Sequence, residues 1–257
     1  MAWIPFPYAD TAYGFPGAAL EQHWGRLHRG DCEPFPTDPK VQDAWRSYHA
    51  GEFGKAVESG LTCGIAGYNV ANKAAAIYAT YLERDDERKR SLLLEVARRC
   101  EEQQEKRPGD ANAWYLHAFA LGRYSQSISV VKALAQGLGG KIKHSLTQAL
   151  EIEPRHADAH VALGAYHAEV IDKVGALVGG LTYGAKKSTG NELLETALKL
   201  NPDSAITRIE YANALLMMFG KARMKDAERL YREAAAFVPM DAMERLDVEA
   251  AKEELAD

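Results

Sequence analysis

Residues 154–167 read PRHADAHVALGAYH, and two other helical segments of the chain open with the same pattern of large and small residues. In this stretch a large residue, His160, is followed by Leu163 and Gly164 and then by a second large residue, His167. The three openings are Trp114-x-x-His117-Ala118-x-x-Leu121, His160-x-x-Leu163-Gly164-x-x-His167 and Arg208-x-x-Tyr211-Ala212-x-x-Leu215. Such self-similarity is typical of repeat proteins, in which each repeat packs on its neighbours.

Prolines at positions 108, 154, 202 and 239 mark the ends of successive repeats. An apolar residue stands eight positions before each proline, and before the last three an alanine stands five positions upstream. The small residue of each opening lets two helices approach closely, while the proline ends the second helix. Because no stretch shows convincing strand alternation, the sequence predicts an all-α fold.

This pattern resembles the tetratricopeptide repeat (TPR), a helical hairpin closed by a proline. The last unit carries the second half of the motif as Ala227-x-x-x-Tyr231-x-x-Ala234. The resemblance implies a right-handed α-solenoid of about five hairpins over residues 38–239, acting as a non-enzymatic scaffold for a protein or peptide partner. We expect an aromatic and proline-rich arm with a short helix in residues 1–37, and an acidic C-terminal capping helix in residues 240–257, all in one domain.

Two of the units are longer than a regular repeat, and their surplus falls within residues 125–141 and 171–189. Both insertions are apolar and glycine-rich, and they resemble each other at a fixed offset of 43 residues. Three interpretations stay open: they prolong the hairpin helices and pack on each other, form an oligomer contact, or line a pocket or touch a membrane surface. The candidate residues for a contact between subunits or with an anion are Leu134, Leu138, Leu177, Leu181, Lys186 and Lys187.

The two insertions also resemble those of the T component associated with TRAP-type transport systems, a trimeric repeat protein that handles a hydrophobic ligand. This resemblance implies an alternative function, in which the chain carries or senses a small hydrophobic molecule and forms a homo-oligomer. An enclosed pocket lined by Tyr115, Phe119, Val161 and Ile209 would favour the carrier. An open groove, or one filled by residues 1–17, would favour the scaffold.

The TPR resemblance also implies where a partner would bind, because the concave wall of such proteins is built from the first helix of each hairpin. On this sequence the wall comprises Asn112, Tyr115, Phe119, Arg123, Asp158, Val161, Ala165, Ile206, Ile209 and Asn213. Most of these residues are apolar, and a few polar residues lie between them. The wall lacks a lysine-rich clamp, so a charged peptide tail is not the expected ligand.

Three histidines, His156, His160 and His167, fall on one helical face, and the first two have the spacing of a metal-binding pair. His160 and His167 nevertheless occupy the large-residue positions of the repeat, so we expect them to pack against neighbouring helices. The stretch Gly179-Gly-Leu-Thr-Tyr-Gly-Ala-Lys-Lys-Ser188 lacks the lysine that a phosphate-binding loop needs at Ala185. We therefore predict no metal, no cofactor and no enzymatic activity.

Composition limits the partners and the compartment. The formal charge is −5, and residues 240–257 hold seven acidic and two basic residues, so the remaining chain is neutral. A neutral body lacks the basic face that nucleic-acid binding requires. Three widely spaced cysteines favour reduced thiols. With no signal-like start and no apolar run long enough to span a bilayer, we expect a cytoplasmic protein.

Overall fold

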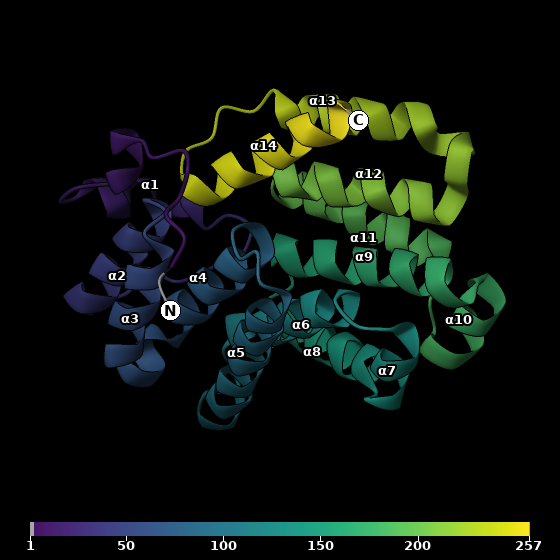
Figure 1. Cartoon of the computed structure of the whole chain (residues 1–257), viewed down its shortest axis with the longest axis horizontal. Coiled ribbons are helices and arrows are strands. Elements are labelled where there is room, and N and C mark those ends of the chain that lie inside the picture. Colours follow the sequence, from purple (N-terminus) through teal and green to yellow (C-terminus); the bar gives the residue numbers. More distant parts are fainter. Residues whose placement is uncertain (1–2, 257) are drawn as a thin grey trace.

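The computed structural model describes residues 3–256, which form helices and turns and no strand (Figure 1). This confirms the predicted all-α solenoid of helical hairpins. The five hairpins pair α2 (Pro39–His49) with α3 (Phe53–Thr62), α4 (Tyr68–Tyr81) with α5 (Asp86–Lys106), α6 (Ala111–Gln126) with α8 (Leu138–Ile152), α9 (Ala157–Val174) with α11 (Lys187–Leu200), and α12 (Ala205–Phe219) with α13 (Met224–Ala235). Helix α1 (Ala19–Leu27) precedes them and α14 (Ala242–Ala256) follows.

The large residue that opens each of the last three hairpins has a specific structural task. The side chains of Trp114, His160 and Arg208 each donate a hydrogen bond to the backbone carbonyl of the proline six positions earlier, at 3.0, 3.0 and 2.8 Å. These bonds fix the turn between successive repeats, since they join the first turn of a helix to the segment that precedes it. His160 therefore faces this turn and is only partly buried, whereas the sequence predicted that it would pack against neighbouring helices.

The small residue of the repeat allows the close contact that the sequence predicted. A Cβ atom added at Gly164 would lie 2.6 Å from Cγ of Leu194, so only glycine lets α9 and α11 approach this closely. Alanine fills the same position in the neighbouring hairpins, and Ala118 and Ala212 are both buried. The spacing of the helices in each hairpin thus follows directly from one small side chain.

Each insertion forms a short helix at the tip of its hairpin. Helix α7 (Val130–Ala135) packs on α8, and α10 (Ala176–Tyr183) packs on α9. The second insertion also prolongs α9, which runs over 18 residues to Val174. Lys143 holds the end of α10, because its Nζ atom donates a hydrogen bond to the carbonyl of Tyr183 at 2.7 Å.

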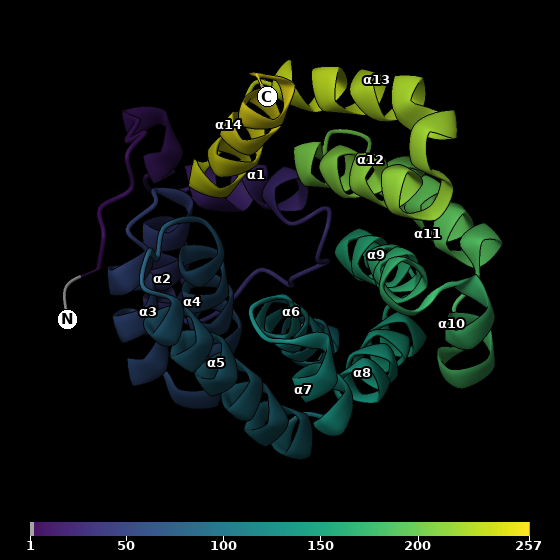
Figure 2. The same cartoon turned by 45° about the vertical axis from the view of Figure 1, so that its right-hand side comes forward.

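The hairpins follow one another around a ring that α14 closes (Figure 2). Helix α14 packs on α12 and α13 and also reaches α2 at the other end of the solenoid. Two side-chain contacts join the ends: Nδ1 of His49 donates a hydrogen bond to Asp241 at 2.7 Å, and Arg26 forms an ion pair with Glu244 at 2.6 Å. The acidic C-terminal helix, predicted as a solvated cap, therefore connects the last repeat to the first.

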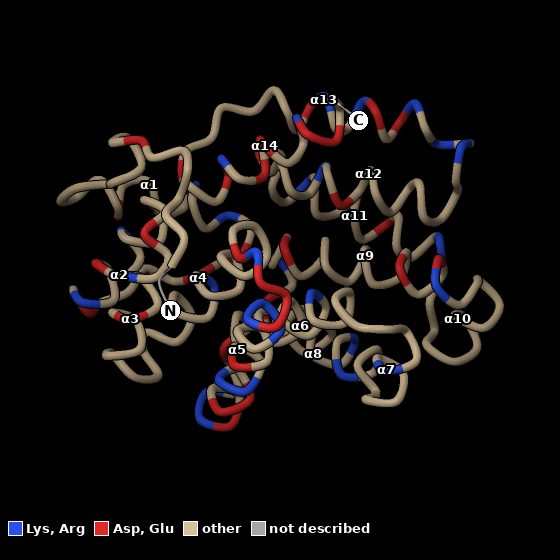
Figure 3. The backbone as a smooth tube through the Cα atoms, in the orientation of Figure 1, with Lys and Arg blue, Asp and Glu red and all other residues tan. Residues whose placement is uncertain are grey.

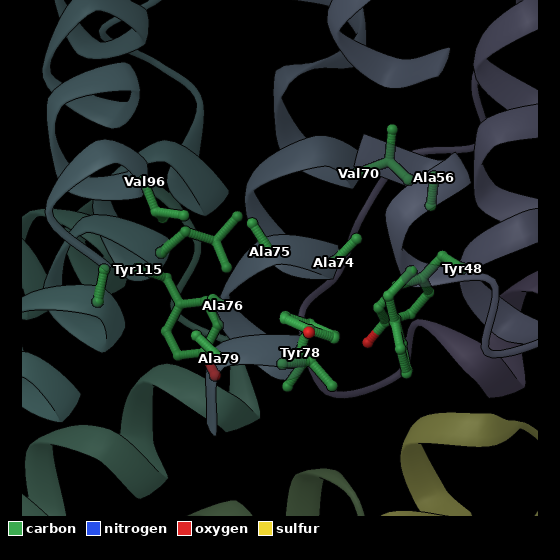
Figure 4. Packing of buried hydrophobic residues seen from close by; sticks show 14 of the residues in the cluster. Tyr48, Ala56, Val70, Ala74, Ala75, Ala76, Tyr78, Ala79, Val96 and Tyr115 are labelled. Atoms are coloured by element: carbon green, nitrogen blue, oxygen red, sulfur yellow. The ribbon is translucent and has the colours of Figure 1, made fainter. Parts of the chain in front are cut away.

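Helix α4 is the most deeply buried element on the N-terminal side of the ring. Its alanines, among them Ala74, Ala75, Ala76 and Ala79, pack between the neighbouring helices with Tyr48 and Tyr78 (Figure 4). Alanine suits this position because its small side chain lets helices approach on several sides at once. No helix within residues 3–256 is long and apolar enough to cross a membrane.

Candidate binding groove on the inner face of the ring

Residues 28–36, which follow α1, cross the inner face of the N-terminal half of the ring. We call them the inner segment. The carbonyl of Gly30 accepts a hydrogen bond from the backbone N–H of Asp158 at 3.0 Å, and the carbonyl of Asp31 accepts one from Asn112 at 3.0 Å. Asn112 also donates to the carboxylate of Glu33 at 2.7 Å. The segment thereby covers the inner ends of α4, α6 and α9.

A buried ion pair anchors the inner segment to α4. The ammonium of Lys73 lies 2.5 Å from the carboxylate of Asp31, which also receives a hydrogen bond from His28 at 2.9 Å. Burial opposes ionisation of Asp31, but Lys73 and His28 outweigh it and hold its pKa well below the usual value. Burial also disfavours the charge of Lys73, yet Asp31 raises the pKa of that lysine. Both residues are therefore charged, and each compensates the other.

The C-terminal half of the inner face is open and forms a groove between α6, α9 and α12. We call it the inner groove; it holds about 840 Å³ of space, including its open mouth. Its walls are mainly apolar, and α4 and α14 contribute Tyr81 and Met243 to it. The lining residues that carry the argument below are Tyr115, Phe119, Arg123, Asp158, Val161 and Ile206.

The structure brings most of the predicted wall residues together in this groove and places three of them elsewhere. Those that line the groove are Tyr115, Phe119, Arg123, Asp158, Val161, Ala165 and Ile206. Asn112 lies buried beneath the inner segment, and Ile209 is buried in the core of the C-terminal hairpins. Asn213 accepts a hydrogen bond from Tyr231 on α13. The groove thus coincides with the part of the first helices that the inner segment leaves uncovered.

Charged side chains lie at the rim of the groove. Arg123 lies 2.8 Å from the carboxylate of Glu210, and its guanidinium stacks over the ring of Phe119 at 5.4 Å. Gln126 donates a hydrogen bond to Glu169, whose pKa is raised by burial. With Asp158, the groove contains three carboxylates and one arginine. A cationic group would therefore complement it better than an anion.

A second, smaller pocket adjoins the groove and has a more polar lining. We call it the acidic well; its volume is about 480 Å³, and it shares Asp158, Ile206 and Met243 with the groove. Four carboxylates and two basic side chains line it. They are Asp158, Asp241, Glu244 and Asp247, with Lys73 and Arg26.

Three of these carboxylates have a side-chain partner that links the two ends of the ring. Asp241 pairs with His49, and this hydrogen bond lowers the pKa of Asp241 although burial opposes it. Glu244 pairs with Arg26. Asp247 accepts a hydrogen bond from Tyr81 at 2.5 Å, and burial raises the pKa of Asp247 well above its usual value.

Asp158 is different from the other carboxylates of the well. Its side chain has no hydrogen-bond partner within residues 3–256, and it lies where the apolar groove meets the acidic well. Burial raises the pKa of Asp158 to about 6, because the nearby Lys73 only partly offsets the loss of hydration. A cation entering along the groove would supply the missing partner.

The aromatic N-terminal arm does not occupy the groove, one of the occupants considered from the sequence. Trp3 contacts Tyr78 with ring centroids 4.5 Å apart, and Phe6 contacts Phe53 at 6.2 Å. Glycine makes room for Trp3, since a Cβ atom at Gly54 would lie 2.4 Å from its indole ring. Within the described residues, none of 3–17 lines the groove. These residues pack on α2, α3 and α4 instead.

The conspicuous histidines of the sequence have structural roles. His156 is fully buried and its Nδ1 atom accepts the N–H of Ala159, which caps α9, while its Nε2 atom donates to Asn112 at 3.0 Å. Burial lowers the pKa of His156 to about 4. His167 is also buried and accepts the backbone N–H of Lys186 at 3.1 Å. Residues 3–256 contain no group of three side chains that could hold a metal ion.

The residues predicted for the insertions separate into buried and exposed groups. Leu138, the first residue of α8, is buried in the core. Lys187 donates a hydrogen bond to the carbonyl of Met218. Leu134, Leu177 and Leu181 are exposed, as is Lys186. The insertions thus place apolar side chains in solvent at the hairpin tips.

Sequence reasoning missed several groove residues. Glu210 lies four positions after Ile206 and so shares its helical face, a spacing that was available in the sequence. Tyr81 ends a helix whose repeat pattern is weak, and Met243 reaches the groove only because α14 closes the ring. No local pattern indicates that closure.

Comparison with known proteins supports the fold and leaves the ligand open. Neither a protein-family model nor a curated protein matches the sequence. Among solved structures, the chain is similar to a thermophilic TPR protein of Thermus thermophilus, with 16% sequence identity and a TM-score of 0.57. The match covers 83% of this chain and 97% of the other. The chain therefore has the fold of a tetratricopeptide repeat protein.

Proposed function

We propose that the chain is a non-enzymatic interaction scaffold that binds an apolar segment of a protein partner in the inner groove. The observation that carries this proposal is an open, mainly apolar groove with an unpartnered carboxylate, Asp158, on its floor. The TPR fold supports a protein partner, because the concave face of such solenoids is an extended binding surface. The acidic lining supports a partner that places a lysine, an arginine or a free amino terminus beside bulky apolar side chains.

The arrangement of the acidic well supports a structural rather than a catalytic role for its side chains. Asp241 is hydrogen-bonded to His49, and Glu244 forms an ion pair with Arg26; both partners come from the opposite end of the ring. These carboxylates therefore already have partners that close the ring. The free thiols of the three cysteines agree with the predicted reducing, cytoplasmic compartment.

The test is a selection of peptides from a displayed random library on the full chain. We expect the selected peptides to combine bulky apolar residues with lysine or arginine. Phe119→Ala should weaken their binding by about tenfold, since a partly exposed aromatic side chain at the centre of a groove is a typical hot spot. Phe119 serves better than Tyr115, because Tyr115 is buried and packs on His156, so its removal would also disturb the core.

The control is Leu94→Ala, which removes an exposed leucine on α5, away from the groove. If the peptides bound Phe119→Ala as tightly as the unmodified chain, the binding surface would have to lie outside the inner groove. Native mass spectrometry of the same preparation tests the carrier alternative. If the unmodified chain retained a small molecule that Phe119→Ala did not retain, the carrier function would be supported and the scaffold function contradicted.

A further inference from the structure

The hairpin tips gather at one edge of the ring and form a surface whose exposed residues do not line the inner groove. It comprises residues 127–143 with α7, residues 170–191 with α10, and residues 217–226 at the turn between α12 and α13. In Figure 1 these elements follow one another along the right-hand edge of the molecule. We call this region the tip surface.

The tip surface concentrates the exposed apolar side chains of the chain. Of the twelve large apolar side chains that are exposed within residues 3–256, eight lie on it. The largest exposed fractions there are 82% for Leu181, 77% for Val131 and 76% for Leu177. The complete set is Val130, Val131, Leu134, Leu177, Val178, Leu181, Met217 and Met224. A concentration of this kind marks an interaction surface, because single exposed apolar residues are ordinarily scattered.

The same surface is strongly basic in a protein that is acidic overall. It holds nine basic residues and two acidic ones, and the positions of basic residues appear as blue segments of the backbone tube on the right-hand side of Figure 3. The basic residues are Lys132, Lys141, Lys143, Lys173, Lys186, Lys187, Lys221, Arg223 and Lys225. Within residues 3–256, none of the eight lysines forms an ion pair with a carboxylate; Arg223 pairs with Asp226. Lys143 and Lys187 donate hydrogen bonds to backbone carbonyls, and the ammonium groups of the other six lysines are available to a partner.

The combination of apolar side chains with unpaired lysines selects one kind of occupant. A second copy of the chain would bring two sets of basic residues face to face, and like charges at close range disfavour such a contact. The interface of an anionic bilayer offers both complements, since acyl chains take up leucine and valine while anionic headgroups attract lysine. The short helices α7 and α10 present their apolar residues at the tips, where shallow insertion requires no change of fold.

We propose that the tip surface binds peripherally to membranes that contain anionic phospholipids. Leu177 and Leu181 on α10, with Val131 on α7, enter the headgroup region, and the lysines around them contact the lipid phosphates and carboxylates. The groove residues Phe119 and Ile206 lie outside the tip surface, so lipid binding leaves them free for a partner. This proposal is independent of the groove function, because it rests on different residues.

The test is co-sedimentation of the full chain with vesicles of phosphatidylcholine, with and without phosphatidylserine. We expect binding to the vesicles that contain phosphatidylserine, and weakening of that binding by added salt. The double variant Leu177→Gln/Leu181→Gln should bind about tenfold more weakly, because two inserted side chains lose their apolar contact. The variant Lys186→Gln/Lys221→Gln should lose a similar factor through two headgroup contacts, again about tenfold. All four side chains are exposed, so these variants should fold normally.

The matched control is Val238→Gln, since Val238 is 83% exposed and lies outside the tip surface. It should bind vesicles as well as the unmodified chain. The proposal is overturned if the unmodified chain does not bind phosphatidylserine vesicles, or if Val238→Gln loses as much binding as the leucine variant. It is equally overturned if size-exclusion chromatography shows a dimer that Leu177→Gln/Leu181→Gln dissociates while vesicle binding is absent.

Discussion

The two halves of the ring's inner face are built from equivalent helices but differ in what covers them. In the N-terminal half the inner segment lies on α4 and α6, and buried partners such as Lys73 and Asn112 bind the polar groups of its Asp31 and Glu33. In the C-terminal half the helices α9 and α12 face an open groove, and Asp158 has no side-chain partner within the described residues. The chain thus supplies its own ligand for one half of the concave face and leaves the other half for a different molecule.

This difference shows how a repeat fold can acquire a specific binding site. A regular solenoid offers one continuous concave wall, whose curvature follows from the packing of successive repeats. Here the inner segment occupies part of that wall, and α14 closes the ring across from it. The groove is therefore defined less by the repeats than by the two non-repeat ends of the chain. Substitutions that act on one half and spare the other can test this division.

The largest effect should come from the ion pair that holds the covered half. Lys73→Met removes the cation that compensates Asp31 and leaves its carboxylate buried, with hydrogen bonds from His28 and from the backbone N–H of Glu33 but no cationic side chain beside it from α4. Removing one member of a buried pair typically costs about 3–5 kcal/mol, because the remaining charge is uncompensated. We expect the free energy of unfolding, measured by urea denaturation, to fall by about that amount.

The double variant Lys73→Met/Asp31→Asn is the control for this prediction. It removes both charges, so it should recover a large part of the lost stability. If Lys73→Met were as stable as the unmodified chain, the inner segment would not depend on this pair for its position. The covered half would then be held by its other hydrogen bonds, among them those from Asn112 and from the backbone N–H of Asp158.

An opposite effect is expected for the unpartnered carboxylate of the open half. The pKa of Asp158 is about 6 in the folded chain, against an ordinary value of 3.8, so the carboxyl ionises more readily after unfolding. Its contribution to stability therefore falls as the pH rises from 3.8 to 6. Asp158→Asn removes this cost and should stabilise the folded chain by up to about 3 kcal/mol at neutral pH.

The pH dependence identifies the cause of that gain. Below pH 3.8 the carboxyl is protonated in both states, so the gain from Asp158→Asn should disappear. Asp172→Asn, an exposed change on the same helix, should leave stability unchanged at both pH values. The same Asp158→Asn variant should bind basic peptides more weakly, since stability gained at a binding site commonly costs affinity. A gain that persisted in acid would show that it does not come from ionisation.

The sequence predicted the fold well because local patterns carry it. The spacing of Gly164 and Pro202 indicates where helices touch and where they end, and both act through contacts within one repeat. The surplus residues after Ser125 and Ile171 likewise follow from the spacing of the prolines. These features need no knowledge of distant contacts.

The site was predicted only in part because it depends on contacts that are distant in sequence. The inner segment meets α9 through Gly30 and Asp158, which are 128 positions apart. The tripeptide Arg29-Gly30-Asp31 is typical of a helix end before a turn, and nothing local shows that Asp31 is buried beside Lys73. Asn112 was assigned to the open wall by its place in the repeat, yet the inner segment covers it. Repeat position predicts the face of a residue but not what lies over that face.

The smallest effect concerns the boundary between the covered and open halves. A Cβ atom at Gly30 would lie 2.3 Å from Oδ1 of Asp158, so Gly30→Ala requires that carboxylate to rotate away from residue 30. The rotation is inexpensive for a side chain without a hydrogen-bond partner, and we expect a loss of about 1 kcal/mol in urea denaturation. Gly25→Ala is the matched control, because no atom lies near its Cβ position in α1 and alanine favours a helix, so this variant should be slightly more stable. If both substitutions changed stability in the same direction, the inner segment would not press against α9, and the boundary of the groove would have to be set by the repeats themselves.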